Sequence, residues 1–245
     1  MPQDYSVLRD NLRWNCDGDP LFIDGADHYK IDRDRLERAA SALQPLHGKT
    51  IADLGSFPGF ALWAFRDCSR YIGIGKSPDW YREQLTRDFG QEWLEWDFES
   101  AEEMPKPSAA IDIALLQEVI EHIRHPKRFL TRLYNWLPSG AVFYVTTNNL
   151  SYIGYILKQL AGKEIFDSAM SEDTVYPGHC TYYSLTGLAD LLSVIGFQIE
   201  SKSHVNFLPQ ARYYRRERSG AMKNLLTRSV PLRYSTHIEV VCRKP

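Results

Sequence analysis

The chain has 245 residues, of which 44% are hydrophobic and 13% aromatic, and its formal net charge is -2. This composition supports a substantial buried core and excludes a disordered or low-complexity protein. The nearly balanced charge and the lack of a recognisable RNA- or DNA-binding module argue against nucleic-acid binding.

The sequence shows no apolar run of the roughly 20 residues needed to cross a bilayer, and its first residues lack the pattern of a secretory signal. We therefore expect a cytoplasmic protein. The four cysteines are Cys16, Cys68, Cys180 and Cys242. Their positions match neither zinc-ligand spacing nor a disulfide framework, so we expect no metal site.

Short apolar, β-rich runs alternate with amphipathic stretches from residue 51 onward, which is typical of βαβ units and a mostly parallel sheet. Ahead of them, residues 33–43 are expected to form an amphipathic helix. The expected strands are 50–54, 71–74, 93–96, 111–116, 142–147, 197–202 and 237–242, and the expected later helices are 60–65, 127–136 and 185–195. This order predicts an α/β fold with a doubly wound sheet.

Two stretches lack clear periodicity and are expected to form caps: residues 1–32, and the irregular residues 148–179 after the fifth expected strand. We expect an N-terminal helical or cap segment over 1–48. A single catalytic-type domain follows over 49–245, with insertions at about 148–179 and 205–235.

The turn after the first expected strand reads Asp53-Leu-Gly-Ser-Phe-Pro-Gly59. Gly55 and Gly59 let a ligand approach the backbone, and the next helix begins with unpaired N–H groups, as a nucleoside cofactor requires. Phe57 replaces the second glycine of the dinucleotide fingerprint GxGxxG. An NAD-dependent dehydrogenase is therefore a weaker alternative.

The sequence IADLGSFPGF around this turn is similar to motif I of class I S-adenosylmethionine-dependent methyltransferases. Residues 109–126, 129–149 and 178–197 resemble later motifs of that family, in the branch of ubiquinone-biosynthesis and small-molecule O-methyltransferases. The resemblance covers about residues 49–202. It implies a Rossmann-like, mostly parallel sheet of seven strands, with S-adenosylmethionine as the cofactor.

The resemblance also assigns cofactor contacts. It predicts that Asp53, Gly55, Ser56 and Gly59 contact the methionine end of the cofactor. It also predicts that Asp97 and Phe98 contact the adenine and that Gln117 contacts the sulfonium. An alternative for Asp97 is a helix cap or a turn.

The family's ribose-binding acid falls on Gly75, and the next residue, Lys76, can only donate hydrogen bonds. Loss of that acid should cost about 1.5–3 kcal/mol of cofactor affinity, unless Asp79, Glu83 or water replaces it.

Two histidines are candidate catalytic residues. His122 lies on an expected helix after the fourth strand and could take the proton of an acceptor hydroxyl; the alternative is a hydrogen bond to backbone. His179, with Tyr182 or Tyr183, could close the site or simply cap and pack the next helix. Two nearby carboxylates, Glu118 and Glu121, are expected at a helix start, where the dipole favours them without a catalytic role.

Aromatic residues of the irregular stretch could line an acceptor pocket or only pack a cap; these are Tyr152, Tyr155, Phe166 and Tyr176. Residues 201–245 hold ten Lys or Arg and two Asp or Glu. Their basic part, 210–228, could contact an anionic carrier or membrane surface, or be a solvated helix face.

The leading hypothesis is methyl transfer to a small-molecule or saccharide acceptor, at oxygen. The alternative, suggested by Gly75, is a non-catalytic methyltransferase-like scaffold or partner subunit with a weakened cofactor site.

Overall fold

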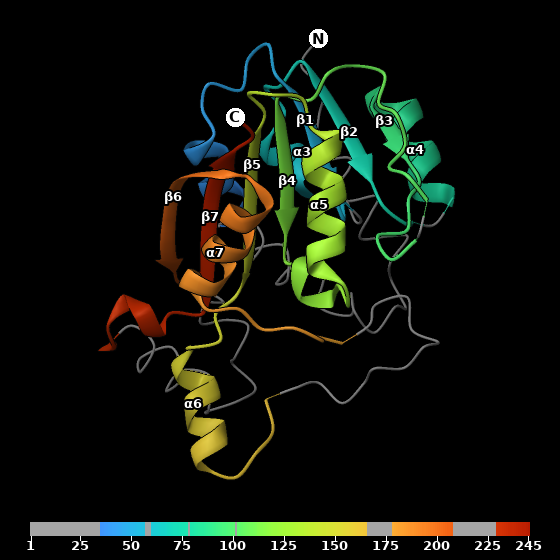
Figure 1. The fold of residues 1–245 in the computed structure, drawn as a ribbon. Coiled ribbons are helices and arrows are strands. Elements are labelled where there is room, and N and C mark those ends of the chain that lie inside the picture. Colours follow the sequence, from blue (N-terminus) through green and yellow to red (C-terminus); the bar gives the residue numbers. More distant parts are fainter. Residues whose placement is uncertain (1–34, 57–59, 78, 101, 166–177, 208–228) are drawn as a thin grey trace.

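The computed structural model describes residues 35–56, 60–77, 79–100, 102–165, 178–207 and 229–245. One seven-stranded sheet forms its centre, in the order β3-β2-β1-β4-β5-β7-β6 (Figure 1). The strands are β1 (Thr50–Leu54), β2 (Arg70–Ile74), β3 (Glu92–Leu94), β4 (Ile113–Gln117), β5 (Val142–Asn148), β6 (Gln198–Val205) and β7 (His237–Arg243). The helices are α3 (Phe60–Ala64), α4 (Asp79–Phe89), α5 (Pro126–Trp136), α6 (Ile153–Leu160) and α7 (Leu185–Ile195), with 3-10 turns η1 (Ile120–His122) and η2 (Leu232–Tyr234).

Neighbouring strands from β1 to β5 pair in parallel, and only β7 runs antiparallel, between β5 and β6. Central strands β1, β4 and β5 are almost entirely buried, which explains why they read as continuous apolar runs. The expected α/β fold with a mostly parallel sheet of seven strands is confirmed.

Helices cover both faces of the sheet. On one face lie α5 and α7, whose Phe129, Leu133 and Leu188 join a core with the strands (Figure 1). The other face packs against residues 35–42, which are helical, and against α3 and α4. The helix expected over 33–43 is therefore present in the described residues, whereas α4 was not expected.

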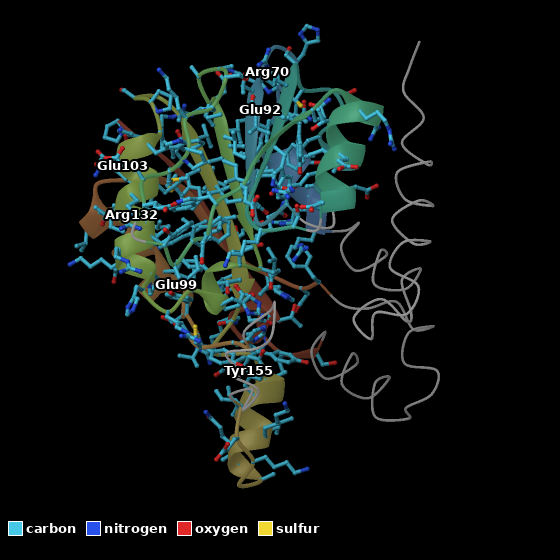
Figure 2. The ribbon with its side chains drawn as sticks, turned by 90° about the vertical axis from the view of Figure 1, so that its right-hand side faces the viewer. Arg70, Glu92, Glu99, Glu103, Arg132 and Tyr155 are labelled. Atoms are coloured by element: carbon cyan, nitrogen blue, oxygen red, sulfur yellow. The ribbon has the colours of Figure 1, made fainter. Side chains whose placement is uncertain are left out.

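Residues 148–179 are not uniformly irregular, as the sequence had suggested, because α6 forms within them. None of its residues is fully buried, and it extends beyond the carboxyl edge of the sheet (Figure 1). Tyr155, in α6, lies at the opposite end of the molecule from Arg70 and Glu92 (Figure 2). The carboxyl ends of the parallel strands therefore point toward α6.

Several expectations fall outside the described residues: those for residues 1–32, for Gly59, for Phe166 and Tyr176, and for the basic segment 210–228. Within the described part of the chain, no helix has both the length and the apolar character that crossing a membrane requires.

Candidate functional site

Asp53 lies inside the sheet near the end of β1, with 4% of its surface exposed. Tyr71, on the adjacent strand β2, donates its hydroxyl to the Asp53 carboxylate, and Ser56 Oγ lies 3.0 Å from Tyr71 Oη. Burial raises the pKa of Asp53 to about 6, although hydrogen bonds from Tyr71 and Ser56 and the charge of Arg35 lower it. Asp53 is thus a buried acid that ionises close to neutral pH.

Two glycines shape the edge beside Asp53. Gly55 has φ +84°, and a Cβ added there would lie 2.5 Å from Val119 Cγ2, so the turn after β1 has no room for a side chain. Gly75 follows β2 and has φ +141°; an added Cβ would lie 3.5 Å from Phe98 Cζ and 3.7 Å from the Gly55 backbone. Where the ends of β1 and β2 and the loop after β3 come together, the surface is therefore formed by glycine backbone without side chains.

Lys76 and Asp97 connect two of these loops. Lys76 Nζ lies 2.8 Å from Asp97 Oδ2, and the backbone N–H of Glu99 donates to Asp97 Oδ1 at 2.9 Å. Burial raises the pKa of Asp97, but Lys76 and the Glu99 N–H outweigh this, so that the pKa lies below its ordinary value. Asp97 therefore stands ionised beside the glycine edge.

Gln117 ends β4 and is 9% exposed. Both atoms of its side-chain amide are buried without a hydrogen-bond partner among the described residues. A buried amide left unpaired costs free energy, so this side chain is suited to bind a ligand. The next residue, Glu118, has the unusual φ of 54°, which turns the chain sharply away from the strand.

Two carboxylates follow Gln117, each with different partners: Glu118 is partly buried and Glu121 is buried. Glu118 is 3.2 Å from His237 Nε2 and 3.9 Å from Arg35 Nη1. Burial raises the pKa of Glu118, but the charges of His237 and Arg35 outweigh it and hold this pKa far below its usual value. Glu121 instead accepts from Thr147 Oγ1 at 2.8 Å and Asn148 Nδ2 at 3.3 Å. Burial, and then the charge of Glu118, raise the pKa of Glu121 well above its usual value.

His122 follows Glu121 in η1, and its ring lies edge-on to that of His179, with centroids 4.8 Å apart. The segment carrying His179 is held to η1, because the N–H groups of Cys180 and Thr181 donate to Glu121 O at 2.8 and 3.1 Å. Tyr182 lies edge-on to His179, and Tyr155 lies edge-on to Tyr182. Aromatic rings from η1, α6 and the segment before α7 thus form one connected wall.

The family described as "Methyltransferase domain" matches residues 28–202, well over half of the chain. The chain belongs to this family. A relative from Mycolicibacterium smegmatis, named "Probable S-adenosylmethionine-dependent methyltransferase", is 28% identical over 98 residues. That match spans 40% of this chain and 33% of the relative.

Solved structures of other methyltransferases share the fold. A complex of the Haloferax volcanii Trm112 methyltransferase activator with a methyltransferase matches at TM-score 0.62 and 19% identity, over 97% of each chain. An S-adenosylmethionine-dependent methyltransferase from Mesorhizobium loti matches at TM-score 0.57 and 18% identity, over 84% of this chain and 95% of that one. Geranyl diphosphate methyltransferase in complex with the cofactor matches at TM-score 0.59 and 11% identity, over 93% and 92%.

Relatives of this methyltransferase-domain protein are named as dependent on S-adenosylmethionine or in complex with it, and this cofactor carries its methyl group on a sulfonium. The described residues suit it, because the unpaired Gln117 amide and the bare backbone of Gly55 and Gly75 lie at the carboxyl edge, where such sheets bind ligands. The edge also brings together most of the cofactor residues expected from the sequence: Asp53, Gly55, Ser56, Gly75, Lys76, Asp97, Phe98 and Gln117. Their individual contacts with the cofactor stay predictions.

Some expectations about the residues after β4 were wrong. The helix expected there is only the three-residue η1, so Glu121 lies in its first turn, as expected, whereas Glu118 lies before it and pairs with His237. His179 does not open a helix, since α7 begins at Leu185 after the N-cap Ser184. The spacing Glu118-x-x-Glu121-His122, directly after a buried strand, is the sequence signal for this cluster.

Proposed function

We propose that the protein transfers the methyl group of S-adenosylmethionine to an oxygen atom of a small-molecule or saccharide acceptor. The observation that carries this proposal is the edge-on contact between the rings of His122 and His179. His122 lies five residues after Gln117, and His179 lies in the segment before α7. An imidazole pair beside the cofactor edge suits an acceptor that must lose a proton, as a hydroxyl does.

The chain's own residues would act mainly by positioning, because methyl transfer from a sulfonium is an in-line displacement. Gln117 and the backbone at Gly55 hold the cofactor, while Tyr155 and Tyr182 give the acceptor an apolar surface that displaces water. His122, half-buried, accepts the proton that the acceptor hydroxyl releases. The aromatic wall suits an acceptor with a flat or sugar-like face.

Two measurements test the proposal. Isothermal titration calorimetry should detect binding of S-adenosylhomocysteine, and the absence of binding by both it and S-adenosylmethionine at millimolar concentration would contradict the proposal. With an acceptor found by screening hydroxylated small molecules and sugars, the His122→Ala variant should lower kcat by roughly 10²–10⁴-fold while leaving the affinity for S-adenosylhomocysteine within about twofold. His125→Ala is the matched control, because His125 is exposed just before α5.

A non-catalytic scaffold is the second candidate, and Gly75 favours it. The ribose-binding acid is missing there, and Asp79, a possible substitute, is mostly exposed and paired with Arg82. The same calorimetry separates the two candidates, because a scaffold with a weakened cofactor site binds both cofactor forms more weakly than a catalytic site does.

A further inference from the structure

Three potential metal ligands lie together at the carboxyl edge: Glu121, His122 and His179. One ligand atom from each, a carboxylate oxygen and two ring nitrogens, all lie within 4.8 Å of one another. Ligands of one bound zinc or iron are about 3–3.5 Å apart, given bond lengths of about 2.0–2.2 Å, so pairs of ligand atoms must approach each other by up to roughly 1.5 Å to complete such a site. The two histidines come from segments that are distant in sequence but joined by backbone hydrogen bonds to Glu121 O.

Within the described residues, Glu121 lacks a cationic side chain that would balance the charge of its carboxylate. Arg35 and His237 form the ion pairs with Glu118, whereas Glu121 has no Lys or Arg within ion-pair distance among the described residues. Glu121 is only 1% exposed, and its neutral partners are Thr147 and Asn148. Buried carboxylates of this kind are usually paired or bind a metal.

The surroundings of Glu121 resemble the outer shell that holds a metal ligand in place. Thr147 Oγ1 fixes one carboxylate oxygen of Glu121, and Asn148 Nδ2 reaches the other oxygen and also Glu118 Oε2, at 3.4 Å. Glu118 Oε1 is buried without a hydrogen-bond donor among the described residues and lies 3.9 Å from Arg35 Nη1, so the charge of Glu118 is directed to Arg35 and His237. Such oriented carboxylates strengthen metal binding.

We propose that Glu121, His122 and His179 bind one divalent transition-metal ion. Two imidazoles with one carboxylate suit Zn²⁺, Fe²⁺, Mn²⁺ or Co²⁺, and three protein ligands leave coordination positions open. Both histidines are half-buried, so these positions are accessible. If the proposed methyl transfer is correct, on which this last step rests, a bound metal would coordinate the acceptor oxygen and promote loss of its proton to water, and His122 would act as a metal ligand in place of the proton acceptor described above.

Metal binding is measured directly, without an acceptor, on full-length protein freed of any affinity tag and of metal. Calorimetric titration with Zn²⁺ and Mn²⁺, and the visible spectrum of the Co²⁺ form, should show one equivalent bound. His122→Ala and His179→Ala should each weaken binding by roughly tenfold or more, and Thr147→Val should weaken it less. His125→Ala, a histidine on the same surface loop but outside the cluster, should bind as the wild type does.

Two results would overturn the site: no stoichiometric binding of any of these ions to the wild type, or unchanged affinity in both histidine variants. His179→Ala changes a segment outside the sheet, so it keeps the test valid if His122→Ala fails to fold. The test also separates this proposal from the methyl-transfer proposal. Metal binding without S-adenosylhomocysteine binding refutes only the latter, whereas cofactor binding without metal binding refutes only the metal site.

Discussion

The Asp53 carboxyl gives the protein a pH dependence that can be attributed to one residue. Its pKa of about 6 lies above the ordinary value of 3.8, so the folded state binds an additional proton between these two values. The contribution of Asp53 to stability is then greatest below about pH 4 and falls by about 3 kcal/mol as pH rises from about 4 to about 6. Urea unfolding at pH 5.0 and 7.5 should show a smaller pH-dependent change for Asp53→Asn than for the wild type. Equal changes for both proteins would contradict the assignment.

Gly75 cannot readily accept the ribose-binding acid that the family resemblance predicts at this position. Its φ of +141° lies in a region that side chains rarely adopt, and an added Cβ would contact Phe98. We therefore expect Gly75→Asp and Gly75→Ala to destabilise the fold by about 1–3 kcal/mol, and Gly75→Asp not to strengthen binding of S-adenosylhomocysteine.

Gly90→Ala is the control for strain, because Gly90 has φ +61° and open space around it. It should cost about 1 kcal/mol, the ordinary cost of a left-handed residue. If urea unfolding gives both alanine variants the same loss, the backbone at Gly75 is not specially constrained. Tighter cofactor binding by Gly75→Asp would instead show that the loop adapts and accepts a ribose-binding acid.

At the scale of elements, α7 depends on a cap at its first turn. Ser184 Oγ accepts a hydrogen bond from Gly187 N at 3.1 Å, while Ser193, in the same helix, donates to the Ala189 carbonyl. Ser184→Ala should lower the free energy of unfolding by about 1 kcal/mol, and Ser193→Ala should change it by less than about 0.5 kcal/mol. Thermal or urea unfolding of the two variants measures this difference; equal losses would mean that the cap contributes nothing.

Buried strands were predictable from sequence because each is a short apolar run enclosed on both faces. For β1 and β5 the expected and observed bounds differ by no more than one residue at either end. Two helices, α4 and α6, were not predicted from the sequence, for opposite reasons. The exposed surface of α4 carries many charged residues and so gives a weak apolar period, whereas α6 is apolar but has no fully buried residue. In both helices, formation depends on tertiary contacts that the spacing of apolar residues in the sequence does not reveal.

Across the whole molecule, the cofactor edge was easier to predict than the cluster beside it. The glycine turn at Gly55 and the acid at Asp53 are local features. The Glu118 environment depends on Arg35 and His237, which are distant in sequence and meet only in the folded chain. Sequence therefore indicates where polar residues follow β4, but it does not show which of them are buried and paired.

A second long-range contact ties the helix at residues 35–42 to β7, which is distant in sequence. Arg38 Nε donates to Glu239 Oε2 at 2.7 Å, and the hydroxyl of Tyr144 donates to the same oxygen at 3.0 Å. Glu239 is 6% exposed, so removal of Arg38 leaves a buried carboxylate short of one partner. We expect Arg38→Ala to lose about 1–3 kcal/mol of stability, despite the partial exposure of Arg38.

A double-mutant cycle with Glu239→Gln tests whether this loss comes from the contact itself. The two substitutions should couple by about 1 kcal/mol or more, because the carboxylate is buried. The ion pair of Lys49 and Asp112 is the control: it has a 3.2 Å separation and side chains that are 41% and 38% exposed, so its coupling should stay under about 1 kcal/mol. If both cycles give the same small coupling, the helix at residues 35–42 is held by its apolar face, through Leu36 and Ala39, and the Arg38 contact is incidental.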